Sequence, residues 1–443
     1  MDNEAPDEAD NALSALQRAE EITAALGQTT AGDHDALEAL LPDLLGHEVK
    51  HYGMAFGKGL ATGASDLVTL WQQLVGAFAA KPERARNPLV LRGYLRGAST
   101  RDPATTARLL DEAISDPLLG PSFPVLQTAV EIGERDAARL EAALQLSLAR
   151  PGAYGYLAYG RVTDSIPSAR LRRIVLAIAS LPEGYEIASE ILAARVFAAK
   201  SDGELIDDEL VQCGQELLAI WSVAIKNHRL AYHLAEIVKA CFAQPEAIPA
   251  FALVCRRLAD ELNGYPTYIS DYPELLTQLF RTHPTVALDE FFGGPAINNR
   301  LLTRWRSSHH VRENPLDAVQ TEIHITWAQA NPSARFPILA SVITPFIDHD
   351  DGTDPTWTPA ALELLCLAPD RVTVLTRLLS PLVPTSWSVS LADILVRRRA
   401  LLHPFLTDAD PAVADWARQR DDELEQQIQQ NRMRERWANE GFE

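Results

Sequence analysis

The stretch IDDELVQCGQELLAIWSVA, residues 206–224, decides the fold class. Its apolar residues recur at steps of four, three, four, four and three, at Ile206, Leu210, Cys213, Leu217, Trp221 and Ala224. This spacing places them on one face of an α-helix rather than on alternate sides of a strand. The same period continues after Pro249, at Phe251, Val254, Leu258 and Leu262.

The rest of the sequence follows the same helical pattern, and we find no convincing run of alternating β-branched residues. Ala and Leu, which favour helices, dominate the apolar residues. Helix starts are marked by a polar side chain that can cap the first turn, followed by a proline, which needs no N–H there. These pairs are Asn87-Pro88, Asp102-Pro103, Asn314-Pro315, Asn331-Pro332, Thr358-Pro359 and Asp410-Pro411. The sequence predicts an all-α protein.

Proline-started helices recur at intervals of 39, 48, 37 and 42 residues, at Pro245, Pro284, Pro332, Pro369 and Pro411. A two-helix HEAT-type unit spans about 40–47 residues, and each hairpin must stack on its neighbours to bury its apolar face. We therefore predict a right-handed α-solenoid of irregular HEAT-like helical hairpins. A mostly polar capping helix is expected to run from Asp410 past Trp416 to Trp437.

Composition divides the chain into three predicted segments. Residues 1–80 form an acidic N-terminal helical segment with a frayed tail, 81–264 form helical repeats, and 265–443 form the C-terminal repeats with the capping helix. Twelve acidic residues and one basic residue, Arg18, lie in Met1–Glu48, so more than half of the excess negative charge is N-terminal.

The 443 residues contain 40 basic and 60 acidic side chains, a net charge of −20, which disfavours general binding to nucleic acid. The longest uncharged runs, such as Leu67–Ala80 and Leu378–Ala392, are too short and too polar to cross a membrane, and the first residues do not read as a secretory signal. The four cysteines lie far apart without a CxxC pair, which is typical of the reducing cytoplasm. We expect a cytoplasmic protein without a cofactor, and the excess of Arg over Lys indicates a bacterial source.

Residues His47-Glu48-Val49-Lys50-His51 match the H-E-x-x-H pattern. On a helix, His47 and His51 would share a zinc ion while Glu48 served as general base, the arrangement of a zinc-dependent metallopeptidase. A catalytic zinc needs a third protein ligand, and the positions where that ligand is expected hold Gly57 and Trp71. The other interpretation is a solvated polar stretch after Gly46.

The segment Gly53–Gly63, GMAFGKGLATG, superficially resembles a phosphate-binding loop. Only three residues separate Gly53 from Gly57-Lys58, and Gly59 stands where a P-loop has Ser or Thr. The segment is therefore predicted to be a flexible helix connection, or a place where helices pack closely through small residues.

Basic and aromatic residues concentrate in the last third of the chain. Arg and Trp together are the composition of binding hot spots, and successive repeats of a solenoid can bring them to one face. We predict that the main contacts with a partner are made by Arg300, Arg304, Trp305, Arg306, Arg397 and Arg398. The alternatives are surface arginines paired with acidic residues, a site for nucleic acid, and a patch covered by the acidic first 48 residues.

Loose motifs near helix starts recur in the same region: Trp327 before Asn331-Pro332, Ala368-Pro369-Asp370, Pro384–Ser388, Asp410–Ala417 and Gly441–Glu443. With these motifs, the stretch from about Arg300 to Glu443 resembles the C-terminal HEAT-like arrays of large bacterial signalling and defence proteins. In that family the arrays are often joined to NTPase modules, and we find no such module in these 443 residues. The resemblance implies a sensing or adaptor role.

These observations favour a non-enzymatic α-solenoid that binds another protein with an acidic surface in a bacterial defence or signalling pathway. The zinc-dependent metallopeptidase and nucleic-acid binding through the C-terminal Arg and Trp clusters remain the alternative hypotheses.

Overall fold

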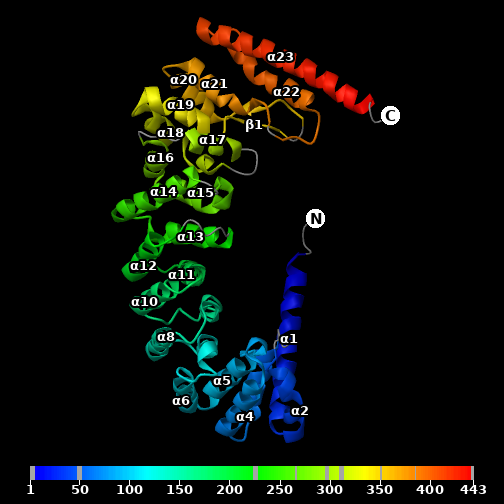
Figure 1. The fold of residues 1–443 in the computed structure, drawn as a ribbon, viewed down its shortest axis with the longest axis vertical. Coiled ribbons are helices and arrows are strands. Elements are labelled where there is room, and N and C mark those ends of the chain that lie inside the picture. The colour runs from blue at the N-terminus through cyan, green and yellow to red at the C-terminus, as the bar shows by residue number, and fades with distance from the viewer. Residues whose placement is uncertain are drawn as a thin grey trace. The chain divides into compact units, whose positions relative to one another are not determined.

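The computed structural model describes residues 5–46, 52–222, 228–264, 267–294, 299–308, 314–349, 352–384 and 386–440. The side chains of residues 5–14, 299–300, 306–308 and 438–440 are outside this description. The described chain is all-α, as predicted, apart from one hairpin of two strands that are two residues long each (Figure 1). It forms two compact units, Met1–Leu217 (unit 1) and Leu218–Glu443 (unit 2), and each is treated separately below. The three predicted segments, with boundaries near 80 and 264, stay a prediction.

Unit 1 consists of helices joined by short turns. Its elements are α1 (Ala5–Ala31), α2 (His34–Leu44), α3 (Gly53–Gly63), α4 (Leu67–Ala80), η1 (Glu83–Ala85), α5 (Leu89–Arg101), α6 (Pro103–Ala113), η2 (Gly120–Ser122), α7 (Phe123–Gln127), α8 (Glu134–Leu146), α9 (Pro151–Tyr154), η3 (Gly155–Ala158), α10 (Ser168–Ala179) and α11 (Gly184–Ser201), followed by α12 (Asp208–Ala219), which runs across the boundary.

Unit 2 continues with α13 (His228–Cys241), η4 (Pro245–Ala247), α14 (Ile248–Asn263), η5 (Ile269–Asp271), α15 (Pro273–Thr282), α16 (Pro284–Phe292), α17 (Asn299–Ser308), η6 (Pro315–Ala318), α18 (Thr321–Gln329), α19 (Pro332–Val342), β1 (Phe346–Ile347), β2 (Thr356–Trp357), α20 (Pro359–Leu367), α21 (Arg371–Leu378), η7 (Ser380–Leu382), α22 (Leu391–Arg399), η8 (Ala400–Phe405) and α23 (Pro411–Glu440). The strands β1 and β2 pair antiparallel, with Phe346 opposite Trp357.

The predicted helix starts are mostly confirmed. Asp102 caps α6, because one of its carboxylate oxygens accepts a hydrogen bond from the Thr105 N–H at 3.0 Å and the other accepts from the Thr105 hydroxyl at 2.7 Å. Both hydrogen bonds lower the pKa of Asp102. Three proline positions differ from the prediction. Pro245 and Pro315 begin short 3₁₀ segments rather than α-helices, and Pro369 lies before α21, which begins at Arg371 with Asp370 as its cap.

Glycines determine how α1, α3 and α5 pack. A Cβ atom added at Gly59 of α3 would clash with the carbonyl oxygen of Ala24 in α1. One added at Gly57, on another side of α3, would clash with the carbonyl oxygen of Val90 in α5, and one at Gly93 of α5 would clash with that of Met54. Backbones can approach this closely only where side chains are absent. Of the two interpretations of the Gly53–Gly63 segment, close helix packing is confirmed.

The glycine contacts also fix the direction of these helices. Gly59 meets Ala24 and Gln28, and Gly63, one turn further along α3, meets Gln28 and Ala31, one turn further along α1. The two helices therefore run parallel, with α2 as the connection that returns the chain. The contacts of Gly93 with Met54 and of Gly97 with Lys58 give the same parallel arrangement for α5 and α3.

Ion pairs join the later helices of unit 1. Arg139 of α8, which is buried, donates to Asp111 of α6 at 2.7 Å and also to the carbonyl oxygen of Ala107 at 2.9 Å. Its hydrogen bond lowers the pKa of Asp111. Arg172 of α10 reaches in the other direction and donates to Glu209 of α12 at 2.9 Å. Guanidinium groups thus bind α8 to α6 and α10 to α12.

We predict opposite effects for two glycine-to-alanine substitutions in unit 1. Gly59→Ala places a methyl group against the Ala24 backbone and should lower the free energy of unfolding of unit 1 by about 1–3 kcal/mol. Gly76→Ala, in α4, meets no atom within 4 Å and should raise it by about 0.5–1 kcal/mol through helix propensity. Urea unfolding followed by circular dichroism measures both. Equal stability of the two variants would contradict the close packing.

A second prediction concerns His324 in α18. The ring is buried, neither ring nitrogen has a hydrogen-bond partner, and burial lowers its pKa to about 4. Because the unfolded chain binds a proton near pH 6.5 and the folded chain does so only near pH 4, stability should be lost as the pH falls through this window. His324→Leu should remove this loss in unfolding curves recorded at pH 7.5, 6 and 5. An unchanged pH dependence would show that another group is responsible.

Candidate functional site

Trp305, predicted to contact a partner, lies in the core of unit 2. Its side chain is 0% exposed, and its ring packs edge-on against Phe292 and Phe280, with ring centres 5.1 and 5.8 Å away. The indole N–H donates to the Oδ1 atom of Asn314 at 3.1 Å. The indole fills the core and satisfies its polar atom internally, so in this fold it does not face a partner.

Arg304, the neighbour of Trp305, caps the end of α14. Its guanidinium donates to the carbonyl oxygens of Leu262 and Thr267, at 2.8 Å each, and to that of Gly264. The last carbonyl groups of a helix have no partner within the helix, and a guanidinium satisfies several of them at once. Arg304 therefore stabilises the end of α14 through these hydrogen bonds.

Arg398 is likewise internal. It is buried, donates to the carbonyl oxygens of Pro381 and Leu382 at 3.0 and 2.9 Å, and forms an ion pair with Asp348. Its guanidinium also lies over the ring of Phe346, 5.2 Å from the ring centre. Arg398 therefore anchors the loop around the β1–β2 hairpin, and the expectation that it faces a partner does not agree with its burial.

The remaining predicted residues have a different status. Arg397 is half-buried on α22 and forms no ion pair with a described residue. The side chains of Arg300 and Arg306 are outside the described part of the chain, as are His47, Glu48 and His51 of the H-E-x-x-H motif. The contact roles of Arg300, Arg306 and Arg397, and the zinc hypothesis, stay predictions. The described residues contain no cluster of three or more His, Cys, Asp or Glu side chains that could hold a metal ion.

The C-terminal turns of α23 carry an exposed surface that the sequence analysis did not single out. We call it the basic end of α23; it consists of Arg432, Met433, Arg434, Arg436 and Trp437, all exposed. Met433 and Trp437 are 47% and 72% exposed and lie one turn apart on one face of the helix. The sequence contains one indication of this surface, because Met433 and Trp437 form an apolar pair in a helix that is otherwise mostly polar.

Two sets of contacts hold α23 against α22, and the two helices lie side by side in Figure 1. Arg399, at the end of α22, donates to Asp421 at 2.7 Å. At the start of α22, Glu435 accepts hydrogen bonds from the Ser390 hydroxyl at 2.8 Å and from the Ala392 N–H at 3.3 Å. The helices are therefore antiparallel, and the basic end of α23 lies beside the first turn of α22.

The carboxylate of Glu435 is bound to the start of α22 and forms no ion pair with the neighbouring arginines. Arg418 and Arg420, earlier on α23, pair with Asp415 and Glu423. None of the three arginines of the basic end forms an ion pair with a described residue, although Arg436 donates to the Arg432 carbonyl oxygen at 3.3 Å.

Exposed apolar side chains also lie on the segment before α22. Trp387 and Val389 are exposed and lie three residues and one residue before Ser390, which donates to Glu435. Exposed aromatic and aliphatic groups beside unpaired arginines are the chemistry of protein-binding hot spots.

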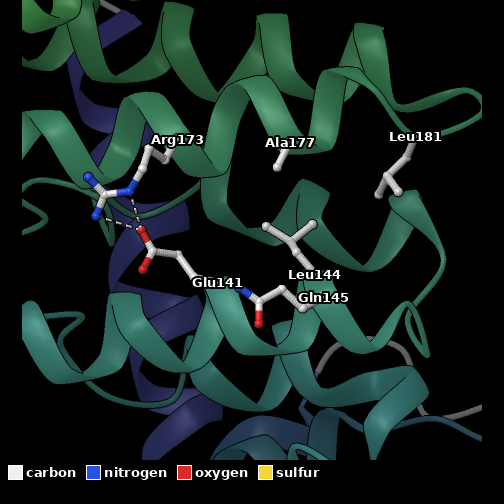
Figure 2. Close-up of a pocket in the computed structure, with 6 residues that line it drawn as sticks. All are labelled: Glu141, Leu144, Gln145, Arg173, Ala177 and Leu181. Atoms are coloured by element: carbon white, nitrogen blue, oxygen red, sulfur yellow. Dashed lines mark hydrogen bonds and ion pairs between the residues drawn. The ribbon is translucent and has the colours of Figure 1, made fainter.

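Two grooves between helices are among the hollow features of the described residues. One in unit 1 encloses about 330 Å³ between α8 and α10 and is shown in Figure 2. The Glu141–Arg173 ion pair closes one end, while Leu144, Ala177 and Leu181 line the other. A wider groove in unit 2, between α13 and α15, has a mixed polar lining that includes Glu236, Lys239, Glu274, Gln278 and Arg281.

Comparison of the chain with protein-family models, with curated proteins and with solved structures finds no match. In the described part of the chain, no helix combines the length and the apolar character needed to cross a membrane. The function must therefore be argued from the surfaces themselves.

Adjacent arginines of α22 provide a matched pair for testing these assignments. Arg398→Ala should lower the free energy of unfolding of unit 2 by about 2–3 kcal/mol, because it leaves two carbonyl groups and Asp348 without their partner. Arg397→Ala should change it by less than about 0.5 kcal/mol. Thermal and urea unfolding measure both. Equal losses would contradict the anchoring role of Arg398.

Proposed function

We propose that this protein is a non-enzymatic α-solenoid of HEAT-like helical hairpins that binds another protein through an acidic surface of that partner. We place it in the bacterial cytoplasm, in a defence or signalling pathway. The basic end of α23 is proposed as the principal contact surface, together with Arg300, Arg306 and Arg397 of the region predicted from the sequence.

The spacing of long-range polar contacts supports the repeat architecture. In a solenoid each repeat touches only its neighbours, so such contacts recur at about the length of one repeat. Contacts 34 to 38 positions apart in the chain occur in both units: Arg170–Glu134, Arg172–Glu209, Arg256–Glu290, Arg371–Asp408 and Trp327–Asp289. This interval lies close to the period that the prolines indicate.

The observation that carries the binding function is the basic end of α23. A chain of net charge −20 exposes three arginines there without carboxylate partners in the described residues, around an exposed Met and Trp. Arg offers several donors in a planar group that fits a carboxylate, and Trp offers a large rigid apolar surface. An acidic partner would be steered to this surface by charge and held by the apolar contact.

The cysteines support the cytoplasmic assignment. All four lie among the described residues, and none is joined in a disulfide. Burial raises the pKa of Cys213 to about 12 and that of Cys255 well above its ordinary value, so both stay protonated and unreactive at neutral pH. Buried thiols of this kind are typical of proteins from a reducing compartment.

The test is quantitative affinity purification from the native host with the full chain as bait. Arg434→Glu combined with Arg436→Glu should reduce recovery of the partner at least about tenfold, because two guanidinium contacts are replaced by repulsion. Trp437→Ala should weaken it separately through the lost apolar contact. The partner found in this way is then produced in pure form, and its affinity is measured by calorimetry at two salt concentrations.

Arg418→Glu with Arg420→Glu is the control, since it makes the same charge change on the same helix at arginines that have internal partners. Recovery that is equally reduced by the control, or unaffected by either variant, would overturn the contact surface. Stoichiometric zinc that is lost on His47→Ala would instead favour the metallopeptidase. Tight binding of a single-stranded oligonucleotide that falls steeply with salt would favour the nucleic-acid hypothesis.

A further inference from the structure

Unit 1 carries a separate group of cations on two adjacent helices. We call it the α3–α5 basic patch; it consists of Lys58 on α3 and of Arg92 and Arg96 on α5. The close packing of the helices brings them together, because a Cβ atom at Gly97, next to Arg96, would lie 3.1 Å from the Cα atom of Lys58. Arg92 and Arg96 are one helical turn apart. Lys58 and Arg96 are exposed, and Arg92 is half-buried.

Among the described residues, no carboxylate forms an ion pair with Arg92. Its guanidinium lies over the ring of Tyr156, 5.6 Å from the ring centre, and makes one long hydrogen bond, 3.4 Å, to the carbonyl oxygen of Thr128. Its Nε atom is shielded from solvent and has no hydrogen-bond partner. Burial and the like charge of Arg96 lower the pKa of Arg92. A partly buried charge without a partner of opposite sign is unfavourable.

Several other arginines of the same unit are paired. Carboxylates bind Arg108, Arg135, Arg139, Arg161, Arg170, Arg172 and Arg173. No cation of the α3–α5 basic patch forms an ion pair with a described residue. The patch therefore places three cations, none with a carboxylate partner among the described residues, on two adjacent helices of a strongly acidic chain.

We propose that the α3–α5 basic patch binds an acidic helix of a partner protein, with two carboxylates one turn apart placed against Arg92 and Arg96. The i, i+4 spacing of the arginines matches the spacing of carboxylates on the facing helix. The Tyr156 ring holds the Arg92 guanidinium in one orientation, which lowers the entropy lost when a carboxylate binds in a bidentate manner. Lys58 adds a third charge at the edge of the same surface.

This inference rests on the proposed binding of an acidic protein, but it concerns a different unit and a different surface. A carboxylate partner is favoured over nucleic acid because the net charge of −20 repels a phosphate backbone over long distances, whereas an acidic helix presents only a few charges.

The probe is a fluorescein-labelled, alanine-rich helical peptide with glutamates one turn apart, and the protein is the full chain. Fluorescence anisotropy should show binding to the wild type that disappears when the glutamates are replaced by glutamines. Lys58→Glu with Arg96→Glu should weaken binding at least about tenfold, and both residues are exposed, so the fold should be kept. The matched control, Arg108→Glu with Arg135→Glu, should bind within about twofold of the wild type.

Arg92→Gln gives a second variant that removes the guanidinium without reversing its charge, and thermal melting shows which variants are folded. Equal weakening by the control would indicate a general field effect and would overturn this inference. Peptide binding that survives Lys58→Glu/Arg96→Glu and is lost on Arg434→Glu/Arg436→Glu would also overturn it, while leaving the proposed function in place. An oligonucleotide that binds at this patch when the peptide does not would overturn it in favour of a phosphate ligand.

Discussion

Guanidinium groups that reach from one helix to the next are the interaction on which both units depend. Arg139 and Arg172 join α6, α8, α10 and α12 in unit 1, and Arg304 and Arg398 hold helix ends and a loop in unit 2. Such groups satisfy carboxylates and the last carbonyl oxygens of helices at the same time. Their hydrogen bonds are strong enough to lower the pKa of Asp408, which pairs with Arg371, to about 2.

This use of arginine determines which cations are available to a partner. A chain with 60 acidic and 40 basic residues can pair an arginine wherever a helix contact needs one and still remain acidic. Basic side chains without a carboxylate partner are therefore informative about function. Two groups of them lie in the described residues, one on the basic end of α23, where Glu435 is bound to the start of α22, and one on the α3–α5 basic patch. Glycine packing explains the second group, because it brings the backbones of α3 and α5 into contact and places Lys58 beside Arg96.

The candidate site was only partly predictable from the sequence. The Arg and Trp composition of residues 298–312 is that of a binding surface, yet Trp305 packs against Phe280 and Phe292, and Arg304 caps α14. Amino-acid composition does not distinguish a Trp that fills a core from a Trp that binds a partner, because core packing and partner binding both depend on the same large apolar ring. Conversely, the final helix appeared to be a polar cap, and its Met433 and Trp437 acquire meaning only when the structure leaves them exposed.

The sequence alone determined the fold class and the local starts of the helices, because periodicity, proline and capping side chains act within one or two turns of the chain. For Gly53–Gly63 it left two alternatives, a flexible helix connection and close helix packing. Tertiary structure decided the contacts of individual residues. Gly57 and Gly59 face different helices, and Arg398 is bound by carbonyl groups and Asp348. Glu435 accepts a hydrogen bond from Ser390 instead of pairing with the arginines beside it. Each of these outcomes depends on a partner tens of residues away in the chain. The physical reason is that the contacts of an arginine or a glycine depend on the residues across the helix interface, and no local sequence pattern specifies those residues.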